Sequence, residues 1–241
     1  GLNIFRDKML SDDRLRIIVD YPLSSECFPG VEIKGGVSYF LWVRDSRGDC
    51  KVITRRNQKE SCLERPLLEK GSDVFIRFNE AIPILRKVLS FNDDSFKSQV
   101  SSQKPFGLRT YITGLPNKFP DSVKIYTNKG FGYIHESDIT SNREYINMHK
   151  VFISMAYGAG EDYPHQIINK PFYGEPFSCC TETYLIIGPY ASKQESINVI
   201  RYIKTRFFRF LVLLKKPTQH AAQKVYEFVP MQDFSKSWTD T

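Results

Sequence analysis

The sequence lacks any apolar run near the ~18 residues that a membrane-spanning helix requires. Its first residues also lack the charged-then-apolar order of a signal peptide. Internal repeats and low-complexity blocks are absent as well, which excludes solenoid and fibrous architectures. We therefore expect a soluble, cytoplasmic protein that has no membrane partner.

Cysteine and histidine are too few and too scattered for a metal site or a disulfide framework. The five cysteines are odd in number and unevenly spaced, and two of them are adjacent. No Cys-x-x-Cys pair occurs, and the four histidines lie far apart in the sequence. We expect reduced thiols and assign no catalytic, cofactor-binding or metal-binding residues.

The 241 residues that are present suit a globular protein with a basic surface. Hydrophobic residues make up 41% of the chain and aromatic residues 14%, which is enough for a core in one large domain or two small ones. The formal net charge of +7 favours polyanionic partners, although many basic proteins have none. The positions of the basic residues must decide between these possibilities.

Helix and strand patterns alternate at the beginning of the chain. Apolar residues recur at helical spacing over 2–10, and a short apolar strand pattern follows directly over 15–22. This order suggests that the chain begins inside an α/β unit. After the turn at Gly35-Gly36, residues 37–43 predict a buried strand that forms a hairpin with the strand at 50–56.

The middle of the chain changes from a polar segment to a region rich in strands. The polar stretch over 57–66 suggests a domain boundary, and 73–90 predicts a helix. Because an interior proline disrupts a helix, Pro83 places the start of its continuous part near Glu80. Short strands are predicted at 108–114, 122–128, 131–139, 149–158 and 182–190.

The clearest helical pattern covers residues 193–214. Ser192 and Glu195 have the spacing of a capping box, and an apolar stripe follows them. Arg201, Lys204 and Arg209 fall on another face, where they match the charge of a phosphate backbone. A solvated outer face is the alternative interpretation. The whole pattern indicates the α/β (α+β) class: a partial sheet, an irregular mixed β body and a long C-terminal amphipathic helix.

A magnesium-dependent nuclease is an alternative suggested by the start of the chain. Glu32 and Lys34 have the acid-x-Lys spacing of nuclease strands, and Asp20 supplies a possible second carboxylate. Such spacing occurs often by chance, and Gly35-Gly36 interrupts the chain immediately after Lys34. A solvated turn is the better interpretation of these residues.

Five longer stretches resemble adenine-specific DNA methyltransferases of restriction-modification systems, including single-chain enzymes that fuse methylation and cutting. "SSECFPGVEIKGGVSYFLW" at 24–42 is similar to the late part of their catalytic domain. The stretches at 101–110, 156–172, 179–188 and 205–221 are similar to the target recognition domain that follows it. The resemblance implies that 1–64 is the tail of the catalytic domain and its sheet, and that 65–241 is the target recognition domain.

The resemblance also implies what the chain lacks. The family binds S-adenosylmethionine through a Gly-rich motif and positions the target adenine with an Asn-Pro-Pro-aromatic motif, and neither occurs in this sequence. Both are expected upstream of residue 1. The chain is then a C-terminal fragment that binds no cofactor and does not methylate alone, while its parent methylates adenine N6 with S-adenosylmethionine.

The expected function is therefore sequence-specific recognition of double-stranded DNA, together with other domains or subunits of a restriction-modification complex. By the resemblance, Phe28 stacks on the flipped adenine. Side-chain chemistry and loop placement add base readers, and the basic helix face adds phosphate contacts. A protein-interaction module, in which the Phe-rich helix packs against another subunit, is a further alternative. The predicted DNA-binding residues are Phe28, Lys104, Arg109, His165, Gln166, Asn169, Arg201, Lys204 and Arg209.

Overall fold

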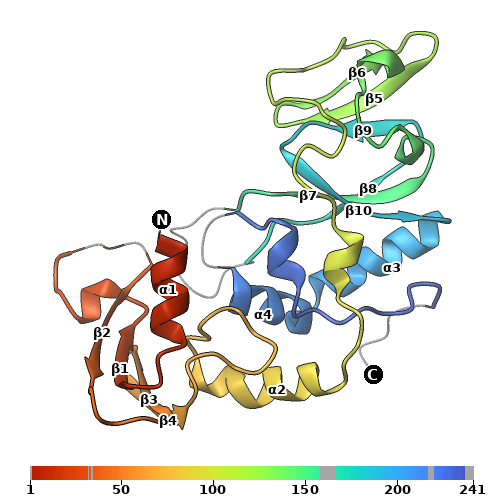
Figure 1. The fold of residues 1–241 in the computed structure, drawn as a ribbon. Coiled ribbons are helices and arrows are strands. Elements are labelled where there is room, and N and C mark those ends of the chain that lie inside the picture. Colours follow the sequence, from red (N-terminus) through yellow and green to blue (C-terminus); the bar gives the residue numbers. More distant parts are fainter. Residues whose placement is uncertain (1, 32, 34, 158–166, 217–219, 237–241) are drawn as a thin grey trace. The chain divides into compact units, whose positions relative to one another are not determined.

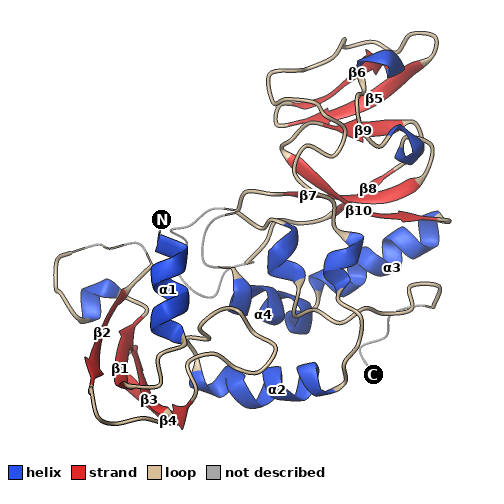
Figure 2. Cartoon of the chain, in the orientation of Figure 1, coloured by secondary structure: helices blue, strands red, loops and turns tan. Residues whose placement is uncertain are grey.

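The computed structural model divides the chain into two compact units, Gly1–Asn92 and Asp93–Thr241 (Figure 1). It describes residues 2–31, 33, 35–157, 167–216 and 220–236. Each unit combines helices with short strands, as Figure 2 shows by colour. The predicted α+β class is confirmed.

A four-stranded sheet with the order β2-β1-β3-β4 forms the body of the first unit. Its central strand β1 (Leu15–Tyr21) pairs antiparallel with β2 (Val37–Trp42) and parallel with β3 (Cys50–Arg56). The predicted hairpin of β2 with β3 is wrong, because β1 lies between these two strands. β3 instead forms its hairpin with β4 (Lys59–Arg65), which occupies most of the segment that the sequence marked as polar.

The prediction that β2 is a buried strand is also wrong. Tyr39, Phe40, Leu41 and Trp42 are between 41% and 52% exposed. The reason is the position of β2 at the edge of the sheet, where β1 is its partner in the described part of the chain. Four successive apolar side chains thus leave apolar surface exposed on both faces of the strand.

Two helices and a long connection complete the first unit. α1 (Leu2–Leu10) confirms the first predicted helix. α2 (Ile82–Ser90) follows a single 3₁₀ turn and carries Pro83 in its first turn, where a proline costs little. Leu67 and Phe75 pack with the core of the sheet, so the compact unit extends beyond residue 65. The functional boundary near residue 65 stays a prediction.

Two three-stranded sheets form the body of the second unit (Figure 1). One has the order β6-β5-β9, with β6 at Gly130–His135, β5 at Ser122–Thr127 and β9 at Ser178–Cys180. The other has the order β10-β7-β8, with β10 at Tyr184–Tyr190, β7 at His149–Ser154 and β8 at Phe172–Gly174. A single core joins side chains from both sheets, among them Val123, Ile125, Ile134, Phe152 and Ile186.

Four of the five strands predicted for this region are confirmed in β5, β6, β7 and β10. The fifth, at 108–114, is wrong, because the structure has turns and irregular backbone there. Gly114 has a φ of +74°, and a Cβ at this position would lie 2.8 Å from the backbone nitrogen of Tyr133. Only the next residue, Leu115, forms an isolated bridge with Tyr133. Leu108 is buried although the segment is not a strand, whereas Tyr111 is 79% exposed.

The predicted long helix consists of two helices, α3 (Lys193–Lys204) and α4 (Arg206–Lys215). The capping box at its start is confirmed, since Ser192 Oγ accepts a hydrogen bond from Glu195 N at 3.2 Å. The break lies at Thr205, whose ψ of 152° is extended and not helical. Along its length α3 packs against β7, β8 and β10.

Candidate nucleic-acid interface

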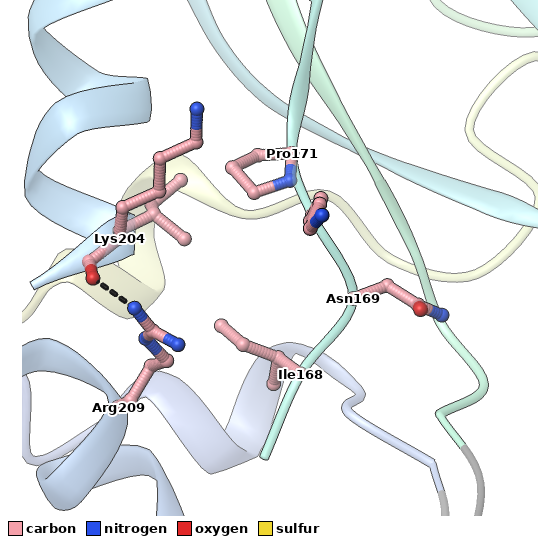
Figure 3. A pocket seen from close by; sticks show the side chains of 7 residues that line it. Ile168, Asn169, Pro171, Lys204 and Arg209 are labelled. Carbon is pink, nitrogen blue, oxygen red and sulfur yellow. Dashed lines mark hydrogen bonds between the residues drawn. The ribbon is translucent and has the colours of Figure 1, made fainter. Parts of the chain in front are cut away.

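A cavity of about 360 Å³ in the second unit brings several of the predicted DNA-binding residues together (Figure 3). One wall is the segment that leads into β8, and the other is the junction between α3 and α4. The cavity is open to solvent. Its lining residues are Ile168, Asn169, Lys170, Pro171, Ile203, Lys204 and Arg209.

The break at Thr205 creates the helical wall of this cavity. Thr205 Oγ1 donates to Tyr202 O at 2.8 Å and accepts from Phe208 N at 3.1 Å. One side chain therefore closes α3 and caps α4. The change of direction between the helices brings Lys204, the last residue of α3, and Arg209, on α4, to the same opening.

One nitrogen of the Arg209 guanidinium group forms a hydrogen bond that holds the side chain in place. Its Nη2 donates to the carbonyl oxygen of Lys204, as the dashed line in Figure 3 shows. This contact satisfies a carbonyl at the C-terminus of α3, where a positive charge is favourable. Its Nε is buried and has no hydrogen-bond partner among the described residues. The positive charge of Arg209 therefore has no carboxylate partner among the described residues, while the contact with Lys204 O orients the group.

The opposite wall carries one polar and one charged side chain. Asn169 Nδ2 donates to Ala156 O at 2.6 Å, and Figure 3 shows its amide directed away from Lys204 and Arg209. The amide of Asn169 thus fixes the backbone of this wall. Lys170 is exposed beside it. Pro171 then leads into β8.

The described lining of the cavity has an unbalanced positive charge. Lys170, Lys204 and Arg209 belong to it, and no Asp or Glu among the described residues does. None of the three forms an ion pair with a carboxylate in the described ranges. Other basic residues of this unit do, as Lys124 does with Glu175 at 2.8 Å. Because three cations share one opening without a counter-charge, an anion is the ligand that the opening favours.

Four other predicted site residues that the structure describes do not line this cavity. Arg201 is exposed on α3, and Lys104 is half-buried in a turn with a φ of +56°. Arg109 is exposed, with its Nη1 3.5 Å from Glu182 Oε2. Phe28 belongs to the first unit, where it is half-exposed in the turn after Ser24–Glu26. His165 and Gln166 lie outside the described residues.

The sequence analysis missed Lys170. It stands directly after Asn169, which was selected for its amide, and before Pro171. The sequence signal that could have identified Lys170 is its position in the stretch 156–172, which resembles the target recognition domain. Its proximity to Lys204 and Arg209 depends on the packing of α3 against β8, which no local pattern reveals.

The nuclease alternative depends on Asp20, whose carboxylate has a structural partner. Arg77 Nε donates to Asp20 Oδ2 at 2.9 Å, and Arg77 Nη2 donates to Asp20 Oδ1 at 2.8 Å. Asp20 is buried, so this bidentate pair occupies both of its oxygens in the interior. Glu32 and Lys34 lie outside the described residues. Among the residues that the structure describes, no group of three or more His, Cys, Asp or Glu side chains is arranged to hold a metal ion.

Substituting asparagine for Asp20 is expected to lower the free energy of unfolding by about 2 kcal/mol, because it removes a charge-assisted pair with Arg77. Because Arg77 is partly exposed, the loss of stability should be smaller than that for a fully buried ion pair. Chemical denaturation measures this change. Asp45→Asn, at an exposed position, is the control and should change stability by less than about 0.5 kcal/mol. Mg²⁺-dependent DNA cleavage that is lost in Asp20→Asn would contradict this structural role.

Comparison with known proteins supports a relation to methylases over part of the chain. No family model matches the sequence. An uncharacterized adenine-specific methylase of Mycoplasma pneumoniae (strain ATCC 29342 / M129 / Subtype 1) is 32% identical over 88 residues. The match covers 35% of this chain and 21% of that protein. About a third of the chain is thus similar to a protein named for adenine methylation. In the described part of the chain, no helix has the length and apolarity needed to cross a membrane.

Proposed function

We propose that this chain is the C-terminal part of a restriction-modification enzyme that methylates adenine N6 within a specific duplex sequence. The observation that carries the proposal is the 88-residue similarity to an adenine-specific methylase. In this proposal the first unit contains the end of the catalytic sheet, and the second unit recognises the DNA. The chain contributes recognition, and the methyl transfer takes place in the parent protein.

The edge strand β2 supports the first half of this proposal. Four successive apolar residues, Tyr39–Trp42, are typical of a strand whose two faces are both covered, as in the sheets of α/β enzymes. Here they are half-exposed at the edge of the sheet. A longer, covered sheet in the parent would bury these side chains and pair the free edge of β2.

The cavity of the second unit supports the second half. Its three cations suit the phosphate backbone of DNA, which dominates the affinity of DNA-binding proteins. Phosphate contacts fix the position of a protein on the duplex, and base contacts then read the sequence. Lys104 and Arg109 remain proposed base readers. Phe28, half-exposed in its turn, is the proposed stacking partner of the flipped adenine.

S-adenosylmethionine does not fit the cationic cavity. The cofactor carries a positively charged sulfonium group, and Lys170, Lys204 and Arg209 would repel it. No residue lining this cavity is therefore assigned to the cofactor. In the proposal it binds to the upstream part of the parent protein.

Binding to a short fluorescent duplex of random sequence tests the proposed function. The chain should bind at about 50 mM salt, and its affinity should fall at least roughly tenfold by about 200 mM, the loss expected when only two phosphates are neutralised. Fluorescence anisotropy measures both affinities. No binding at the lower salt concentration would contradict the proposal and would favour the protein-interaction alternative.

A further inference from the structure

We infer that the cavity between the α3–α4 junction and the segment before β8 holds one sugar-phosphate step of the DNA backbone, clamped by Lys170, Lys204 and Arg209. This inference rests on the proposed function and specifies how the second unit contacts DNA. It assigns the three cations to a single phosphate group. The sequence analysis predicted phosphate contacts by Arg201, Lys204 and Arg209 along one helix face. Such a row of side chains would contact several phosphates.

Charge supports a phosphate as the ligand. Three cationic side chains reach the opening from two segments more than 30 residues apart, and none is neutralised by a carboxylate of the described chain. A guanidinium group suits phosphate because its donors lie in a rigid, planar fork. Arg209 is already oriented by its bond to Lys204 O. Orienting the group before binding reduces the entropy lost when the ligand arrives.

The volume of the cavity and the apolar part of its lining indicate a ligand larger than a phosphate ion. A volume of about 360 Å³ falls in the range of sites for small organic ligands. Ile168, Pro171 and Ile203, which are largely buried, form the apolar part of the lining beside the cations. The carbon atoms of a deoxyribose would contact this surface while the adjoining phosphate meets the positive charges.

The lining also indicates contact with the backbone and not with base edges. Base edges in the major groove are read by the amide of asparagine or glutamine on adenine, or by arginine or lysine on guanine. Asn169 supplies an amide, but one of its N–H groups donates to Ala156 O, and Figure 3 shows the amide directed away from Lys204 and Arg209. Lys170, Lys204 and Arg209 instead bring three positive charges to one opening, and these match an anionic phosphate better than the uncharged edge of a base. The cavity should therefore increase affinity without selecting a sequence.

Substitutions by glutamine test the inference, because glutamine removes the charge and keeps most of the side-chain length. Lys170→Gln, Lys204→Gln and Arg209→Gln are prepared singly and together in the whole chain, and duplex affinity is measured across a salt series. The triple variant should bind about tenfold more weakly, and the slope of log affinity against log salt should fall in magnitude by about 1, the value for one phosphate. The sequences that are preferred should not change.

A charge-matched control separates this effect from a general loss of positive charge. Lys51, Lys59 and Lys70 are exposed lysines of the first unit, and their triple glutamine variant should leave the salt slope unchanged. Arg209→Gln also removes a bond to the end of α3, so its thermal unfolding is compared with that of the wild type. Lys170→Gln removes no hydrogen bond given by the structure and tests the inference without this complication.

The outcomes distinguish the inference from the proposed function. If the wild type does not bind duplex DNA, both fail. If the wild type binds, and the triple variant keeps its affinity and its salt slope, the inference fails and the proposed function stands. A third measurement uses a deoxynucleoside monophosphate as the probe. Binding of this probe that is lost in Lys170→Gln, with duplex affinity unchanged, would identify a free-nucleotide site and overturn the backbone assignment.

Discussion

Replacing Arg65 with methionine is expected to lower the free energy of unfolding by about 3–5 kcal/mol, the usual cost of removing one partner from a buried ionic network. Arg65 is 1% exposed. Its Nε donates to Asn79 Oδ1 at 3.1 Å, its Nη1 donates to Pro66 O at 3.3 Å, and its Nη2 donates to Ile76 O. Its Nη1 also lies 3.9 Å from the buried Glu69. Methionine fills similar space but leaves these acceptors without their donor.

The same network explains why the first compact unit extends beyond β4. Arg65 is the last residue of that strand, and its guanidinium group ties the following connection, through Ile76 and Asn79, to the sheet. Asn79 also donates to Val52 O at 2.9 Å. Loss of Arg65 should therefore release this connection together with α2.

Urea denaturation followed by circular dichroism measures the loss. Arg55→Met is the matched control: Arg55 pairs with Glu60 at 2.8 Å, but both side chains are largely exposed. Such a surface pair contributes at most about 1 kcal/mol. Equal losses in the two variants would show that Arg65 has no special structural role.

Phe96→Ala is expected to lower the free energy of unfolding by about 3–5 kcal/mol, because it empties the centre of an aromatic cluster. Phe96 is fully buried. Its ring centroid lies 5.1 Å from that of Phe208, 6.0 Å from that of Tyr202 and 6.0 Å from that of Phe234. The three neighbouring rings belong to α3, α4 and the C-terminal segment. The space left by the Phe96 ring would therefore weaken the packing of all three elements.

The junction that forms the candidate DNA site depends on this cluster, since Tyr202 and Phe208 flank the break at Thr205. Thermal unfolding of Phe96→Ala measures the loss of stability. Phe91→Ala provides the control, because Phe91 is 64% exposed and its removal should cost less than about 0.5 kcal/mol. A loss in Phe96→Ala of less than about 1 kcal/mol would contradict the role of the cluster.

The sequence predicted the elements whose signals are local. The apolar periodicity identified α1 and α2, and alternation with turn residues identified β5 and β6. The capping box at Ser192 was recognised because its two residues are three positions apart. Such patterns require no knowledge of distant partners.

Strand order could not be predicted in the same way. Residues 37–43 and 50–56 are separated by a short polar turn, which is the pattern of a hairpin, yet β1 inserts between the two strands. The apolar side chains of β1 need neighbours on both sides, and this tertiary requirement prevailed over the local signal. The exposure of β2 follows from the same arrangement.

The candidate site was predicted only in part. Lys204 and Arg209 were expected on one face of a continuous helix, whereas they meet across the break at Thr205. Lys170 and the pair of Asp20 with Arg77, 57 positions apart, depend on tertiary contacts that a local pattern does not contain.

The central claim, that this chain recognises a specific duplex sequence, is tested most directly by selection from a pool of random duplex DNA. The chain is mixed with the pool at low salt and at higher salt, and the retained molecules are sequenced. The account predicts that one short motif is enriched, more clearly at the higher salt, where contacts to phosphates alone are weakened. A retained pool with the same composition as the input would contradict sequence recognition, and no retention at either salt would contradict DNA binding altogether.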